Sequence, residues 1–112
     1  MQLVLSKIQA LQGVQGACIY RNTQLLAATP LPIQLDKVNQ VIPALDQLFN
    51  DLEAKHRDYN ELCITLSNHL IVVYKLQNHY MLLVITEKRV HLPMVQMGIK
   101  AAIRHLGFEV ST

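Results

Sequence analysis

Apolar and polar residues follow one another between Glu61 and Thr86 in a pattern that predicts three consecutive β-strands, at 61–67, 69–76 and 80–86. The first of these strands alternates strictly. Its apolar positions are Leu62, Ile64 and Leu66, and the positions between them are Glu61, Cys63, Thr65 and Ser67. A period of two is typical of a strand with one buried face. The segments that join the strands are short, so we expect an antiparallel meander.

The first third of the chain predicts a helix followed by a hairpin. Apolar residues at 4, 5, 8 and 11 have helical spacing, and Gly13 is suited to end that helix in a left-handed conformation. Strands are expected at 17–20 and 24–29. Asn22, between them, tolerates the positive φ angle that a tight hairpin loop requires.

A long helix is predicted from Asp36, a suitable N-cap, to about Lys55, after a proline-rich loop. Pro43 lies inside this segment, where proline removes a backbone hydrogen bond and clashes with the preceding turn. The helix therefore either bends at Pro43 or starts near it. The apolar residues keep one helical phase across the proline, which favours one bent helix. They occupy positions 35, 38, 42, 45, 49 and 52.

The last predicted element is a helix with Pro93 in its first turn. We expect it to end near Arg104 and His105, ahead of Gly107. Its expected buried stripe consists of Leu92, Val95, Ile99, Ala102, Ile103 and Leu106. The order αββαβββα predicts an α+β domain over residues 1–112, with a five-stranded antiparallel sheet and three helices.

Two features leave apolar or hydrogen-bonding surface without a partner. The strand at 61–67 contains neither Pro nor Lys, which natural proteins use to protect exposed sheet edges. The long helix has an apolar arc of roughly 180°, although a helix with one buried face needs only about 100°. The excess lies at Val41, Ala44 and Leu48. Either the bend or a neighbouring helix covers these side chains, or they join the strand in a symmetric interface. That interface would comprise Val41, Ala44, Leu48, Glu61, Cys63, Thr65 and Ser67.

Composition narrows the class of protein. Hydrophobic residues make up 51% of the 112 residues and charged residues 16%, which excludes a disordered chain. The net charge is only +2 and the basic residues are scattered, so we expect no binding to nucleic acid. No apolar run approaches the roughly 18 residues that span a bilayer. The first residues do not resemble a secretory signal, and we therefore expect a cytoplasmic protein without membrane insertion.

Candidate chemistry is sparse. The chain has no phosphate-binding G-x-x-x-x-G-K-[ST] loop, no dinucleotide fingerprint and no histidine or cysteine spacing typical of a metal site. Its serines lack the context of a catalytic nucleophile. We therefore expect no catalytic residue, no cofactor and no enzyme activity. Four arginines, at 21, 57, 89 and 104, are available to act on a partner, and nothing in the sequence singles one out.

The order of elements, together with the glycine pair of GVQGACIYRNTQLLAAT, resembles the Roadblock family of dynein light chain type domains. Profilin-like and longin-like domains share parts of this layout. The Roadblock resemblance covers nearly the whole chain and implies a dimerising scaffold that binds or regulates a small Ras-like GTPase, or a light chain of a motor. It also implies that the second helix and the third strand form the dimer interface. Pro43 departs from the commoner pattern of that helix.

These observations lead to one hypothesis and one alternative. The hypothesis is a non-enzymatic, cytoplasmic dimer that binds a Ras-like GTPase and changes its nucleotide cycle or location. A homodimer and a heterodimer with a second Roadblock-like chain both remain open. The alternative is a small-molecule sensor with a profilin-like or PAS-like layout, which would enclose its ligand between the sheet and a helix.

Overall fold

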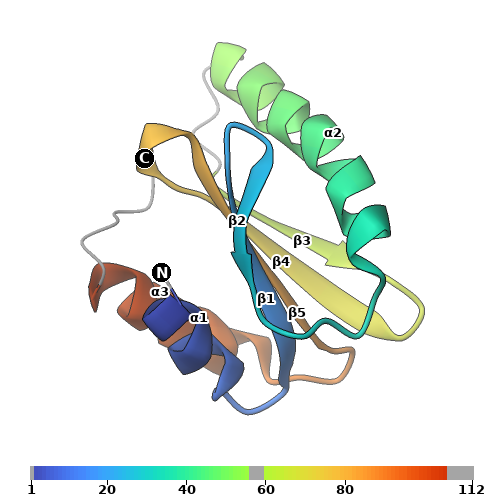
Figure 1. The fold of residues 1–112 in the computed structure, drawn as a ribbon, viewed down its shortest axis with the longest axis vertical. Coiled ribbons are helices and arrows are strands. Elements are labelled where there is room, and N and C mark those ends of the chain that lie inside the picture. The colour runs from blue at the N-terminus through green and yellow to red at the C-terminus, as the bar shows by residue number, and fades with distance from the viewer. Residues whose placement is uncertain (1, 56–59, 106–112) are drawn as a thin grey trace.

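The computed structural model describes residues 2–55 and 60–105. Across these residues the chain forms three α-helices, five strands and one 3₁₀ turn, in the predicted order (Figure 1). The elements are α1 (Gln2–Gln9), β1 (Val14–Arg21), β2 (Gln24–Ala28), α2 (Leu35–Ala54), β3 (Glu61–Thr65), β4 (His69–Lys75), η1 (Gln77–His79), β5 (Tyr80–Glu87) and α3 (Leu92–His105).

All five strands belong to one antiparallel sheet with the order β2-β1-β5-β4-β3. The first hairpin, β1-β2, and the meander β3-β4-β5 meet where β1 pairs with β5, with Ala17 opposite Val84. This arrangement places β2 and β3 at the two edges of the sheet. The predicted fold class is confirmed, and so is the prediction that the strand beginning at Glu61 lies at an edge.

Helices cover both faces of the sheet (Figure 1). On one face α1 and α3 pack together over alternate residues of the strands, with Ile8 and Ile99 fully buried. On the other face α2 packs alone, and its residues Ile42 and Phe49 are buried against the sheet. The residues that α2 covers in the sheet include Cys18, Tyr20, Ile71, Val73, Met81, Leu83 and Ile85. Alternation in the strands therefore creates two cores rather than one buried and one solvated face.

The two glycines before the first hairpin allow close approaches of the backbone. Gly13 has φ +90°, and a Cβ atom there would clash with Val90 Cγ2. Gly16 lies in β1 beneath the proline-rich loop, where a Cβ atom would lie 2.8 Å from the carbonyl oxygen of Pro30. Both positions exclude a side chain for steric reasons, and Gly13 also adopts a conformation that favours glycine.

Several element boundaries differ from the prediction. Helix α1 ends at Gln9, because the Leu11 N–H bonds to the Ile8 carbonyl in a 3₁₀-type closure and another turn follows before Gly13. The hairpin loop contains only Asn22 and Thr23, both with positive φ. Arg104 and His105, near which the last helix was predicted to end, lie in the last turn of α3, whereas Leu106 of the predicted buried stripe and Gly107 lie outside the described residues.

Helix α2 begins one residue before the predicted N-cap. The N–H groups of Lys37 and Val38 both reach the Gln34 carbonyl, so Gln34 is the N-cap and Asp36 lies in the first turn, where its negative charge favours the helix dipole. The helix continues through Pro43 to Ala54. The prediction of one helix that runs through Pro43 is confirmed, and a helix that starts near Pro43 is excluded. None of the helices in the described ranges is long and apolar enough to cross a membrane.

Candidate interaction surface

The outer edge of β3 presents unpaired backbone groups. Along the inner edge, the Lys75 N–H donates to the Asn60 carbonyl and the Leu66 N–H donates to the His69 carbonyl, both at 2.8 Å. Hydrogen-bonded and non-hydrogen-bonded positions alternate in an antiparallel pair. The even-numbered residues of β3 therefore direct their N–H and C=O groups toward β4. Those of Glu61, Cys63 and Thr65 point outward, away from the sheet.

The side chains of these same three residues lie on the face that α1 and α3 cover. Cys63 is directly opposite Val72, and Glu61 is opposite Tyr74, both of which belong to the core beneath α3. Leu62 and Ile64 lie on the other face, where they pack in part against the α2 core. The side chains of β3 on the α3 face are therefore polar, and those on the α2 face are apolar.

Glu61 is tied to α3 within the chain. Gln96 Nε2 donates a hydrogen bond to the Glu61 carboxylate, and Lys100 Nζ lies 3.8 Å from Glu61 Oε1. Glu61 was predicted as an interface residue, and its backbone does face outward. Its side chain, however, already has partners on α3, because the turn of α3 above the edge strand brings residues 96 and 100 to it.

The thiol of Cys63 is exposed at the edge, yet it is not activated as a nucleophile. Partial burial raises its pKa, and the negative charge of Glu61 adds to the increase. Burial likewise raises the pKa of the neighbouring Tyr74 hydroxyl, with Glu61 contributing. Both groups are therefore neutral at physiological pH, which favours a role in packing and pairing over covalent chemistry.

Helix α2 exposes the apolar residues that the sequence identified as excess. Val41 is 46% exposed, Leu48 is 43% exposed and Ala44 is also exposed, whereas Val38 and Leu45 are buried against the sheet. Within the described residues no other element covers Val41, Ala44 and Leu48. The interpretation that a bend or a neighbouring helix buries them is therefore wrong for this part of the chain.

The exposed flank of α2 faces the side of the molecule on which β3 lies. On the opposite flank, Asn39 Oδ1 accepts a 2.6 Å hydrogen bond from the Tyr20 hydroxyl of β1, which orients that flank toward the centre of the sheet. At about 100° per residue, Val41, Ala44 and Leu48 lie roughly 140° to 200° around the helix from Asn39. Figure 1 shows β3 on the side of the sheet next to α2. We call these three residues and β3 together the β3–α2 surface.

Ser67 and Leu66 lie beyond the end of β3, because the strand ends at Thr65 and Ser67 belongs to the bend that leads into β4. Ser67 therefore does not extend the ladder edge, as the longer predicted strand required. Leu66 was placed on a buried face by its alternation, but it is 37% exposed. Leu66 therefore adds an exposed apolar side chain at the end of the β3 edge, and the alternation pattern did not predict this exposure.

Comparison with solved structures identifies the architecture. The structure of the Roadblock/LC7 domain from Streptomyces avermitilis is similar with a TM-score of 0.77, 10% identity and coverage of 96% of this chain and 94% of that one. The fold is that of a Roadblock/LC7 domain. The resemblance inferred from the sequence is thereby confirmed at the level of the fold.

Two MglB structures have the same fold. Myxococcus xanthus MglB is similar with a TM-score of 0.80 and 14% identity, and the match covers 93% of this chain and 89% of that one. An MglB with tetrameric arrangement has a TM-score of 0.72 and 22% identity, with coverage of 94% and 83%. No family model matches the sequence, and no curated protein matches it significantly. The structure therefore shows a shared fold that sequence similarity alone does not.

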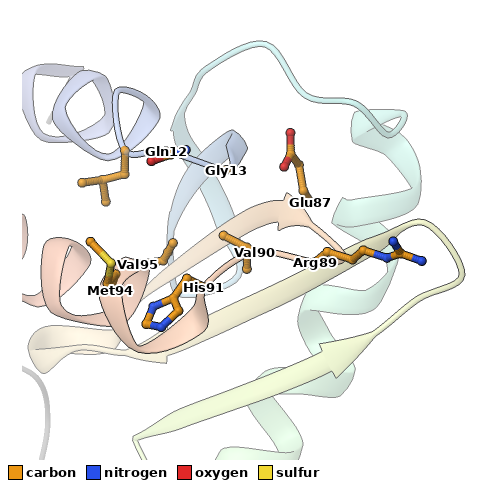
Figure 2. Close-up of a pocket in the computed structure, with 9 residues that line it drawn as sticks. Gln12, Gly13, Glu87, Arg89, Val90, His91, Met94 and Val95 are labelled. Carbon is orange, nitrogen blue, oxygen red and sulfur yellow. The ribbon is translucent and has the colours of Figure 1, made fainter.

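A pocket of about 320 Å³ opens at one end of the Roadblock/LC7 sheet, between the loop after α1 and the start of α3 (Figure 2). Leu11, Val90 and Val95 give it apolar walls, and Glu87 and His91 lie at its exposed rim. Figure 2 shows the Arg89 side chain extending away from Met94 and the apolar wall. The pocket is a surface depression between loops, not the cavity between sheet and helix that the sensor alternative requires.

The arginines do not converge on one site. Arg21 lies over the Tyr80 ring at 5.1 Å from its centroid, which is a cation–π distance. Arg89 and Arg104 are exposed at opposite ends of α3, and Arg57 lies outside the described residues. Within the described ranges no three His, Cys, Asp or Glu side chains are grouped closely enough to hold a metal ion.

Proposed function

We propose that this protein is a non-enzymatic dimeric scaffold that binds a small Ras-like GTPase and modulates its nucleotide cycle or location. The observation that carries this proposal is the β3–α2 surface, an open sheet edge beside an exposed apolar helix flank on a Roadblock/LC7 fold. Unpaired edges are normally protected in monomeric proteins, so an edge without protection favours a partner strand.

The proposed dimer joins two β3 edges into one continuous sheet and places the α2 helices side by side. Such an interface would bury on the order of 1,500 Å², the size of a stable protein interface. One MglB of the same fold has a tetrameric arrangement, which supports self-association as a proposal for this chain. A second Roadblock-like chain with its own open edge could take the same place.

The proposed roles of this protein and of its GTPase partner follow from the chemistry of the chain. The sequence contains no phosphate-binding loop, and Cys63 and Tyr74 are neutral at physiological pH. The GTPase therefore supplies the nucleotide site, and this protein supplies a rigid platform. Because the cytoplasm holds such GTPases, we also propose a cytoplasmic location.

Binding to purified Ras-like GTPases from the same host tests the proposal. Each GTPase is loaded with GDP or with a non-hydrolysable GTP analogue and mixed with the protein, and the complex is measured by sedimentation velocity together with GTP hydrolysis. We expect one GTPase to bind in one nucleotide state with a changed hydrolysis rate or a stable complex. If every GTPase sediments independently in both states, the proposed function is wrong.

Two double variants test whether the dimer forms through the β3–α2 surface. Leu48→Glu with Thr65→Lys introduces two charges into the β3–α2 surface and should separate the dimer. Met97→Glu with Gln24→Lys places the same charges on α3 and on the other sheet edge, at residues that are also exposed. The second pair should leave the dimer intact. Loss of the dimer in both variants, or in neither, would show that the wrong surface has been chosen.

A ligand-binding role is the second candidate, and the pocket between α1 and α3 is the observation in its favour. Both sheet faces are filled with buried apolar side chains, so a ligand would have to bind at this open end. A small molecule that stabilises the wild-type protein but not a Val95→Trp variant would support this role over the scaffold.

A further inference from the structure

The outer side of α3 carries a strip of exposed apolar side chains. Met94 and Met97 are 67% and 72% exposed, and Ala101 is also exposed. Their spacing of three and four residues places them together on one side of the helix. Ile99 is fully buried on the opposite side, against the sheet. We call Met94, Met97 and Ala101 the α3 strip, which is about two helical turns or 10 Å long.

The pocket at the end of the sheet adjoins this strip. Met94 belongs to both, because its side chain lines the pocket together with Val90 and Val95 (Figure 2). Leu11 closes onto α3 at Gly98, where a Cβ atom would lie 2.7 Å from Leu11 Cδ2. The volume of about 320 Å³ lies at the lower end of the range for small-molecule sites, so it suits one large side chain of a partner.

The surroundings of the strip and the pocket are basic. Neither α1 nor α3 contains an Asp or a Glu residue. The charged side chains of the two helices and of the loop that leads into α3 are Lys7, Lys88, Arg89, Lys100 and Arg104. Among these five, only Lys100 has a carboxylate within ion-pair distance in the described part of the chain, at 3.8 Å from Glu61 Oε1. Glu87, at the rim of the pocket, is the one acidic residue between positions 87 and 105.

The other face of the sheet has the opposite charge. Helix α2 contains one lysine and four acidic residues, which are Asp36, Asp46, Asp51 and Glu53. On α3, two cations border the strip directly. At about 100° per residue, Lys100 and Arg104 lie roughly 60° and 20° around the helix from Met97. A partner that covers the strip therefore meets uncompensated positive charge along one side and needs negative charge there.

We propose that the α3 strip and the adjoining pocket form a docking site for an acidic amphipathic helix of a partner protein. The apolar side chains of this helix lie along Met94, Met97 and Ala101, with one of them in the pocket, and its carboxylates lie beside Lys100 and Arg104. Such helices bind through apolar residues at positions i, i+3 or i+4, and i+7. Methionine suits this purpose, because its flexible and polarizable side chain adapts to a partner.

This site goes beyond the proposed scaffold function. It lies on the sheet face opposite α2, so a protein bound there leaves the exposed flank of α2 free. A chain with both surfaces joins its GTPase complex to a second protein.

An anionic membrane surface also attracts basic residues, but the shape and composition of the site favour a protein. Helices that bind at membrane interfaces use Trp, Phe and Leu on a broad apolar face. The α3 strip consists of two methionines and one alanine, and the pocket beside it is concave. A protruding side chain of a folded partner fits such a pocket.

Selection from a peptide library tests which chemistry the site accepts. Phage that display random peptides of about 16 residues, enough for four helical turns, are selected on the full-length protein. They are depleted on Met97→Glu with Gln24→Lys, which places a negative charge in the strip. We expect the enriched peptides to have a net negative charge and apolar residues spaced by three and four. Enrichment of neutral or basic peptides, or no enrichment, would contradict the proposal.

The affinity of the most enriched peptide, measured by fluorescence anisotropy, locates the site with variants that the selection did not use. Met94→Glu should weaken binding at least about ten-fold. Leu48→Glu makes the same kind of change at an exposed apolar residue of α2 and should leave the affinity unchanged. Glu87→Gln removes the acidic side chain at the rim and should strengthen binding about two-fold, a gain that misfolding cannot cause. Equal affinities of Met94→Glu and Leu48→Glu, or no gain with Glu87→Gln, would overturn the proposal.

Sedimentation with vesicles tests the membrane as the occupant. The vesicles contain phosphatidylcholine with about one third of anionic phosphatidylserine, at physiological salt. We expect the protein to remain in the supernatant. Sedimentation of wild type but not of Met97→Glu with Gln24→Lys, without peptide binding, would assign the strip to a membrane and contradict the proposal. Binding of a GTPase is measured in its own experiment, so failure of the docking site and failure of the proposed function are distinguishable.

Discussion

The Cys18 thiol is a nucleophile type that the fold uses as a core side chain. It lies in β1 beneath α2 and is fully buried. Burial raises its pKa to about 11, despite a hydrogen bond with Tyr20 that lowers it. Cys18 and Cys63 fall in different predicted strands, far apart in the sequence, and we expect both to be buried or half-buried. The prediction is confirmed for Cys18 and wrong for Cys63, which is exposed at the sheet edge.

A pH dependence of stability follows from Cys18. Below about pH 9 the thiol is neutral in both the folded and unfolded states, so ionisation of Cys18 does not reduce the free energy of unfolding. Between about pH 9 and about 11 the unfolded state loses the proton first, so the free energy of unfolding falls by at most about 1.4 kcal/mol per pH unit. Denaturant unfolding of Cys18→Ala between pH 8.5 and 10 should show a shallower decline than wild type. Equal slopes would contradict the assignment.

Gly13 gives a second prediction at the residue scale. Alanine there would adopt φ +90° and place its Cβ against Val90, so Gly13→Ala should lower the free energy of unfolding by about 2 kcal/mol. Chemical denaturation measures this loss. Gln12→Ala, at the exposed neighbouring position, should change stability by less than about 0.5 kcal/mol. Similar effects of the two variants would show that the close approach is unimportant.

At the scale of elements, the sequence pattern predicted the type and order of the α-helices and strands found in the described residues, but not the 3₁₀ turn at Gln77–His79. The ends were less predictable, because they depend on contacts between distant residues. Helix α1 stops at Gln9 and not at the glycine, and β3 stops at Thr65 because the chain must turn to meet His69. Local sequence signals such as Asp36 and Gly13 identify suitable residues near an end but do not fix the end itself.

Pro43 gives a prediction for α2 as an element. The Asn39 carbonyl has no N–H partner at position 43, and Pro43 itself is exposed. Pro43→Ala should therefore raise the free energy of unfolding by up to about 3 kcal/mol. The change is best measured by thermal and urea unfolding in the Leu48→Glu and Thr65→Lys background, which removes any contribution from dimerisation. A decrease in stability would mean that the proline is needed to seat the helix on the sheet.

At the scale of the whole molecule, the sequence predicted which residues are exposed better than it predicted what surrounds them. The excess apolar arc at Val41, Ala44 and Leu48 was visible from helical phase alone, and these residues are exposed. The hydrogen bond from Gln96 to Glu61 was not predictable, because it joins residues 35 positions apart through the packing of α3. The outward direction of the β3 backbone groups likewise required the register with β4.

The structure also explains why the sequence is compatible with both the scaffold and the sensor hypotheses. The sensor alternative rests on apolar strands that could surround a ligand, but α1, α2 and α3 fill both sheet faces. In the described residues the open surfaces include both sheet edges, β2 and β3, the exposed flank of α2, the exposed Met94 and Met97 of α3 and the pocket at the end of the sheet. The β3 edge is the one that lies on the side of the exposed apolar flank of α2, which is why association through it is the central proposal.

The most direct test of this account is the molar mass of the wild-type protein in solution, measured by light scattering during serial dilution through the micromolar range. The account predicts about 25 kDa, twice the 12.7 kDa of one chain, for wild type and for Met97→Glu with Gln24→Lys. It predicts about 13 kDa for Leu48→Glu with Thr65→Lys, with an unchanged circular dichroism spectrum. A wild-type mass of about 13 kDa at every concentration would contradict it.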